Sequence, residues 1–203
     1  FLRNLQSSYP DTRTFPNFDN KLRDAFRTET EMFVTEVFRN DHSVLDLLTA
    51  DWTYVNDRLA DHYGIPNIYG SHFRKVEQVD DERRGLLGHG SILTVTSYPN
   101  RTSPVLRGKW VMENVIGSPA PPPPPNVPDL QENQGSDVMS VRERLELHRQ
   151  DPVCSSCHSL LDPLGFALEN FDAIGRFRTK EEGGMVDVSG QLGDGTQIEG
   201  IND

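Results

Sequence analysis

The residues best suited to chemistry lie at positions 154–158, which read Cys-Ser-Ser-Cys-His. Cys154 and Cys157 are the only cysteines in the chain. A C-x-x-C-H sequence is typical of a c-type haem attachment site, where each thiol forms a thioether with one haem vinyl group. The histidine that follows the second cysteine, His158, is then the proximal ligand of the iron. The motif therefore predicts one covalently bound haem c.

Two other chemistries could use the same residues. A thioredoxin-like dithiol needs a strand, the C-x-x-C turn and a helix in a β-α-β domain, and the surrounding sequence lacks that pattern. A zinc site needs four ligands, which His148, Cys154, Cys157 and His158 would supply. Because His158 directly follows Cys157, the pair suits haem better than one tetrahedral ion. Haem is favoured, and zinc stays open at this point.

The second axial ligand of the iron has three candidates. His148 lies on the apolar face of the helix expected before the motif, and six residues of chain are long enough to wrap around a porphyrin edge. Met185 is the only methionine after the motif, but it follows Glu182-Gly183-Gly184, where an exposed side chain is expected. His89, between two glycines, is a weaker third candidate. From the residues alone, His148 and Met185 both stay open as the distal ligand, and a core histidine explains His148 equally well.

Arg107 and Trp110 share one expected helix and form a second candidate group. An arginine beside an aromatic residue in a haem protein often pairs with a propionate, while the indole packs against the ring. A solvated arginine on a helix face explains Arg107 equally well.

The elements expected to position these residues are mainly helical. In the N-terminal third, Leu22, Phe26, Phe33 and Val37 recur at helical spacing between about Asp19 and Asn40. Shorter helices are expected at Ser43–Thr49 and Thr53–His62, followed by a short strand at Phe73–Gln78.

The C-terminal part is also expected to be rich in helices. One begins at Ser103-Pro104 and stops at Gly117. A proline-rich strut at 119–128 follows, because a proline run adopts stiff polyproline II. Ser140 and Glu143 form a capping box that opens a helix with Val138, Val141, Leu145 and His148 on one face. Another helix is expected to begin at Asp162-Pro163, with Leu164, Leu168 and Phe171 along one face. The tail after Arg176 is expected to form small hairpins.

Composition limits the partners. The 203 residues carry 20 Lys and Arg against 31 Asp and Glu, a net charge of −11. This charge argues against nucleic acid, whose phosphates require a basic surface, and it is compatible with a basic redox partner. No apolar run approaches the ~20 residues that span a bilayer. The chain starts without an initiator Met or a signal peptide, as expected of a piece of a longer protein.

Several long motifs resemble one family, the large, multi-domain, secreted c-type cytochrome-like proteins of Planctomycetes and related bacteria, which are built from domains of unknown function. The motifs that carry this resemblance are Arg84–Gly88, Arg101–Val111, His148-Arg149, Cys154–His158 and Asp162–Arg176. Residues 31–70 are similar to the end of the domain that precedes the haem domain in that family.

The resemblance implies an exported protein, periplasmic or extracellular, with covalent haem c and a presumed electron-transfer role. His148 and Arg107 match family motif positions, whereas Met185 matches none. The resemblance therefore favours His148 as the distal ligand, with Met185 as the alternative. The resemblance also places the start of the haem domain near residue 81. We therefore expect a mainly α chain, with a helical segment at 1–80 that ends a preceding domain. A small α-rich c-type haem domain with short C-terminal strands is expected at 81–203, including the strut.

The expected function is electron transfer through a single haem, to redox partner proteins or other haem domains. Whether the chain is an enzyme stays uncertain. A peroxidase-like or oxidase-like enzyme would need an open iron and a distal acid–base residue, for which no sequence signature is present. A structural haem in a surface assembly is a further alternative, since a covalently bound group can stabilise a small core.

Overall fold

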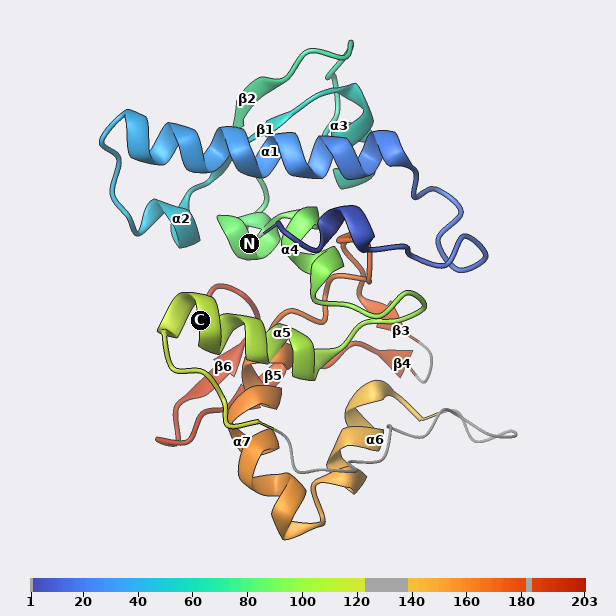
Figure 1. Ribbon diagram of the computed structural model, residues 1–203, viewed down its shortest axis with the longest axis vertical. Coiled ribbons are helices and arrows are strands. Elements are labelled where there is room, and N and C mark those ends of the chain that lie inside the picture. The colour runs from blue at the N-terminus through green and yellow to red at the C-terminus, as the bar shows by residue number, and fades with distance from the viewer. Residues whose placement is uncertain (1, 123–138, 182–183) are drawn as a thin grey trace. The chain divides into compact units, whose positions relative to one another are not determined.

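The structure is a computed structural model that describes residues 2–122, 139–181 and 184–203 (Figure 1). It is mainly α with short antiparallel strand pairs, which confirms the predicted fold class. The described residues form two compact units. The first contains the residues up to Thr102 together with Phe171–Phe177, and the second contains Ser103–Asn170 together with Arg178–Ile201. Residues 81–102 thus pack with the first unit, while the division into domains at 80/81 stays a prediction.

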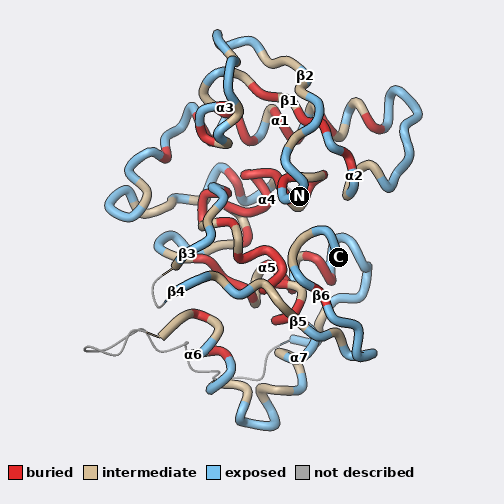
Figure 2. The backbone as a smooth tube through the Cα atoms, turned by 180° about the vertical axis from the view of Figure 1, so that it is seen from behind, coloured by how far each residue is buried: buried red, intermediate tan, exposed pale blue. Residues whose placement is uncertain are grey.

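The first unit contains a long helix, three short ones, three 3₁₀ turns and one strand pair. In chain order these are η1 (Leu5–Ser7), α1 (Asn20–Arg39), α2 (Asp46–Thr49), β1 (Trp52–Val55), α3 (Asp57–Tyr63), β2 (Arg74–Glu77), η2 (Asp81–Arg83), η3 (Leu86–Gly88) and α4 (Gly90–Val95). Figure 2 shows α4 as an almost continuously buried segment, and Gly90 to Thr94 are all buried.

Helix α1 confirms the predicted helix. The Asp19 carboxylate accepts a hydrogen bond from the Leu22 amide at 2.7 Å and so caps the first turn. Its apolar residues at helical spacing, Leu22, Phe26, Phe33 and Val37, are all buried.

The helix predicted over Thr53–His62 is wrong in its first part. Trp52–Val55 form strand β1, which pairs antiparallel with β2 so that Trp52 faces Glu77 and Val55 faces Arg74. The aromatic and β-branched residues of β1 favour a strand, and its partner lies about twenty residues further along the chain. Helix α3 begins only after Asn56, which caps it, and ends at Gly64 with a φ of 76°.

A buried polar cluster lies inside the first unit. The Glu29 carboxylate accepts hydrogen bonds from Thr53 Oγ1 at 2.8 Å and from the Tyr63 hydroxyl at 2.6 Å. Burial raises the pKa of Glu29 to about 7, while these two hydrogen bonds and the Arg83 charge act in the opposite direction. Burial, assisted by Arg83, lowers the pKa of the neighbouring His89 to about 3. His89 is therefore neutral, and its 3.9 Å contact with Glu29 is not an ion pair.

The second unit contains three α-helices, one π-helical turn and two hairpins. These are α5 (Pro104–Val111), the π turn η4 (Met112–Ile116), α6 (Val141–His148), α7 (Pro152–Phe166), β3 (Lys180–Glu181), β4 (Gly184–Met185), β5 (Ser189–Gln191) and β6 (Gln197–Glu199). Strands β3 and β4 form one antiparallel pair, and β5 and β6 form the other, as predicted for the tail. Residues 117–122 are neither helix nor strand. The rest of the predicted strut, 123–128, lies outside the described residues.

Helices α5 and α7 pack with their backbones in contact. A Cβ atom at Gly108 of α5 would collide with the carbonyl oxygen of Leu161, and one at Gly165 of α7 would collide with the carbonyl oxygen of Pro104. Glycine is required at both positions because any side chain would force the helices apart. This contact holds the second half of α7 in place.

The predicted helix start at Asp162-Pro163 is wrong. Helix α7 runs without interruption from Pro152 to Phe166, with Pro163 inside it. An interior proline removes one backbone hydrogen bond and costs about 3 kcal/mol in an isolated helix. Here the helix continues because its last turn is buried against α5 at Gly165. Leu168, expected on this helix, lies beyond its end.

Candidate functional site

Helix α7 places the three residues of the motif on one side of its first half. Asp151 caps the helix by accepting a hydrogen bond from the Val153 amide at 2.8 Å, and Pro152 occupies the first turn. Cys154, Cys157 and His158 stand at positions i, i+3 and i+4, which are neighbours on a helix surface. All three side chains are half-buried, and neither cysteine forms a disulfide. Two free thiols and one imidazole therefore point to the same region.

His158 has a buried carboxylate as its partner. The distance between His158 Nδ1 and Asp162 Oδ1 is 2.9 Å, and the Asp162 side chain is 0% exposed. The second oxygen, Oδ2, is buried without a hydrogen bond among the described residues and lies 3.7 Å from Arg149 Nε. Sequence analysis missed Asp162, although an aspartate four residues after a helical histidine is a recognisable signal.

His148 is brought to the site by α6. The predicted capping box is present, because Ser140 Oγ accepts from the Glu143 amide at 3.2 Å and Glu143 accepts from the Ser140 amide at 2.7 Å. Val141 and Leu145 of α6 are buried against Phe166. His148, the last residue of α6, makes an edge contact with His158, with ring centroids 5.1 Å apart and an interplanar angle of 73°. Val138, expected on the same face, lies outside the described residues.

An exposed apolar stripe borders the thiols. Val153 and Leu160 each lie about one helical turn from Cys157 on α7, and they are 63% and 44% exposed. Leu147, next to His148, is 52% exposed. The helix therefore presents apolar surface to solvent beside the two thiols.

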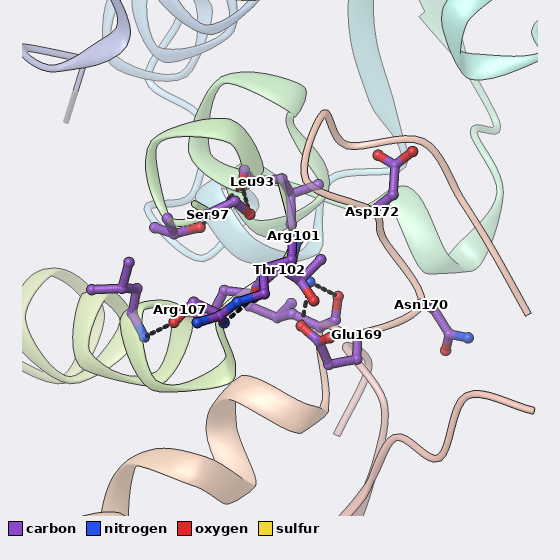
Figure 3. A network of polar contacts seen from close by, with 12 residues as sticks. Leu93, Ser97, Arg101, Thr102, Arg107, Glu169, Asn170 and Asp172 are labelled. Carbon is purple, nitrogen blue, oxygen red and sulfur yellow. Dashed lines mark hydrogen bonds and ion pairs between the residues drawn. The ribbon is translucent and has the colours of Figure 1, made fainter. Parts of the chain in front are cut away.

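Arg107 lies in a buried ion pair and not on a solvated helix face. Its Nη1 donates to Glu169 Oε1 and to the Leu168 carbonyl oxygen, both at 2.7 Å, and the side chain is 0% exposed (Figure 3). These contacts join α5 to the segment that follows α7. Trp110, one turn further along α5, is half-buried. The predicted roles of Arg107 and Trp110 at a haem propionate and ring stay predictions.

The other two ligand candidates have different surroundings. Met185 in β4 is 67% exposed, as expected from its glycine-rich sequence. His89 belongs to the first unit, where its Nδ1 lies 3.0 Å from Thr30 Oγ1 and its Nε2 lies 3.5 Å from Thr53 Oγ1. Both ring nitrogens of His89 are therefore engaged within that unit.

The four residues of the zinc alternative do not converge. Among the residues that the structure describes, no group of three or more His, Cys, Asp or Glu side chains is arranged to hold a metal ion. His148 and His158 touch at their ring edges, but Cys154 and Cys157 do not complete a tetrahedral set with them. The arrangement is a row of thiols and imidazole along a helix.

Comparisons with known proteins found two family models and nothing more specific. Residues 1–65 match PSD4, described as a protein of unknown function (DUF1592), and residues 83–181 match PSCyt3, described as a protein of unknown function (DUF1588). No curated protein and no solved structure matches the chain. Both family names belong to planctomycete-type cytochrome c domain families. The chain is thus similar, over two consecutive segments, to two domain families of unknown function whose names belong to planctomycete-type cytochrome c families.

Proposed function

We propose that this chain binds one haem c covalently through Cys154 and Cys157 and transfers single electrons. The observation that carries this proposal is the position of the C-x-x-C-H sequence on α7, with both thiols free and on the same side as His158. The cytochrome-type names of the matching families support the same class of protein. A bound haem iron would supply one-electron chemistry.

The residues of the chain fit such a group in three ways. The two thiols are spaced one helical turn apart, so both can bond to one edge of a planar macrocycle. His158 has its Nδ1 held by Asp162, which leaves Nε2 to ligate the metal, a common arrangement around metal-binding histidines. The exposed stripe of Val153 and Leu160 provides apolar surface that a bound macrocycle would cover.

We propose His148 as the second axial ligand, in preference to Met185. Its contact with the His158 ring supports this choice, whereas Met185 is largely exposed on a hairpin.

An exported location follows from the same proposal, because thioether attachment of haem belongs to the periplasm or the extracellular space. No helix within the described residues is long and apolar enough to cross a membrane. We expect the electron partners to be redox proteins or further haem domains, and the net charge of −11 favours a partner with a basic surface.

The visible spectrum of the exported chain tests the redox function. We expect a six-coordinate haem that can be reduced and reoxidised and that binds neither carbon monoxide nor cyanide rapidly. Rapid binding of either ligand by the native protein would show an open iron and favour a haem enzyme instead. A Cys154→Ala/Cys157→Ala variant should lose the spectrum, while Ser159→Ala, an exposed change on the same helix, should retain it.

A further inference from the structure

Asp162 is a fully buried carboxylate that the sequence motif does not explain. It lies one turn after His158 on α7, and its hydrogen bond to His158 Nδ1 is the one that its carboxylate makes among the described residues. Burying a carboxylate is unfavourable unless it is paired or hydrogen-bonded. The partners of the Asp162 carboxylate are therefore the His158 imidazole at Oδ1 and the guanidinium of Arg149, whose Nε lies 3.7 Å from Oδ2.

The direction of the hydrogen bond follows from the chemistry of the two groups. A carboxylate can only accept, so the proton of the bond belongs to His158 Nδ1. A neutral imidazole carries one N–H, so its other nitrogen, Nε2, then has a free lone pair. His158 shares one side of α7 with the two thiols, because the three residues stand at positions i, i+3 and i+4 of the helix.

We infer that Asp162 is a positioning residue that fixes His158 in the Nδ1–H tautomer and strengthens Nε2 as an electron donor to iron. The inference rests on the proposed haem site and adds to it the residue that tunes the proximal ligand. Partners of this kind fix ring orientation and raise ligand basicity. A more basic imidazole stabilises ferric over ferrous iron, so Asp162 lowers the reduction potential.

Glu146 offers a matched control. It is a half-exposed carboxylate at the end of α6 that lies 3.8 Å from Arg149, as Asp162 does at 3.7 Å, but it makes no contact with His158 that the structure describes. Glu146→Gln removes a charge near the same arginine without changing the imidazole. Differences between Asp162 and Glu146 variants therefore isolate the hydrogen bond to His158.

The first experiment measures the reduction potential of the haem-loaded chain. We expect Asp162→Asn to shift the potential upward and Glu146→Gln to leave it unchanged within error. The haem content of each variant is measured in parallel. Equal potentials in all three proteins, at equal haem content, would overturn the inference.

The second experiment does not depend on haem. Nitrogen-15 NMR of the full haem-free chain reports which ring nitrogen of His158 is protonated. We expect protonated Nδ1 and bare Nε2 in the unaltered chain and in Glu146→Gln, and loss of that preference in Asp162→Leu, with circular dichroism to verify folding. Protonated Nε2 in the unaltered chain would overturn the inference even if Asp162→Leu failed to fold. Failure to attach haem would instead contradict the proposed function alone.

Discussion

At the scale of single residues, the identity of the distal ligand decides the electronic character of the proposed site. Two imidazoles place the reduction potential below that of a His/Met pair, because a thioether favours the ferrous state. His148 touches the His158 ring in the structure, while Met185 is 67% exposed on β4. The proposed pair of His148 and His158 therefore predicts a low reduction potential.

The distal ligand can be assigned from the near-infrared spectrum of the oxidised protein. We expect no sulfur-to-iron charge-transfer band in the unaltered chain, and none in Met185→Ala. His148→Ala should change the spectrum to that of a five-coordinate or water-bound iron. A sulfur band that disappears in Met185→Ala and persists in His148→Ala would show that the methionine is the ligand.

The motif residues could be recognised from sequence because attachment chemistry requires a fixed local spacing. Asp162 was missed because the pair Asp162-Pro163 also resembles a helix start, and only the continuous α7 turns it toward His158. The surroundings of Arg107 were not predictable, since its partner Glu169 lies 62 positions further along the chain.

At the scale of elements, the contact between α5 and α7 determines how firmly the second half of α7 is held. Gly108→Ala would place a methyl group against the Leu161 carbonyl oxygen, and overpacking of this kind destabilises by about 1–3 kcal/mol or more. Gly165→Ala should act similarly through Pro104. Urea unfolding of the second unit, monitored by Trp110 fluorescence in a Trp52→Phe background, measures the loss of stability.

Gly193→Ala is the control for this prediction. The nearest atom to a Cβ at Gly193 is Leu160 Cδ2 at 3.8 Å, an ordinary contact distance. We expect its stability to stay within about 0.5 kcal/mol of the parent, as is usual for surface changes. If the Gly108→Ala variant is as stable as the Gly193→Ala variant, helices α5 and α7 do not approach each other as the structure describes.

Elements with strong local signals were predicted, and those that depend on distant pairing were not. The capped helix α1, the capping box of α6 and the Ser103-Pro104 start of α5 follow from residues a few positions apart. Strand β1 forms because β2 pairs with it, and helical periodicity in a short segment carries no information about that partner.

At the scale of the whole molecule, the chain leaves the first unit after Thr102, returns to it at Phe171–Phe177 and then rejoins the second unit. Phe171–Phe177 belongs to the first unit, where Arg83 Nη2 donates to the Gly175 carbonyl oxygen at 3.0 Å and Gly175 lies against Gly90. Such long-range packing is not encoded in local composition, which is why residues 81–102 were not predicted to pack with the N-terminal segment.

The buried polar cluster predicts how the stability of the first unit depends on pH. Burial raises the pKa of Glu29 from its usual 4.5 to about 7. Its contribution to stability is therefore complete below pH 4.5 and is lost as the pH rises through about 7. His62 and His89 act in the opposite sense, because burial lowers the pKa of each from 6.5 to about 3. Their contribution to the stability of the first unit is therefore present above pH 6.5 and is lost as the pH falls through about 3.

Glu29→Gln isolates the carboxyl group. The amide stays neutral at all pH values; its oxygen can accept one of the two hydrogen bonds, from Thr53 or from Tyr63, while its NH2 group takes the place of the other carboxylate oxygen. The free energy of unfolding of this variant, relative to that of the parent, should rise by a few kcal/mol between pH 5 and pH 8, since one pKa unit corresponds to about 1.4 kcal/mol. Urea titrations monitored by Trp52 fluorescence in a Trp110→Phe background give the difference. A difference that does not change with pH would show that Glu29 has an ordinary pKa.

The most direct test of the account is the intact mass of the denatured, exported chain, produced where haem and thioether-forming machinery are present. We predict a mass increase equal to one haem that survives acid–acetone extraction and is absent in Cys154→Ala/Cys157→Ala. An unshifted mass, or a haem that acid–acetone removes completely, would contradict covalent attachment at Cys154 and Cys157.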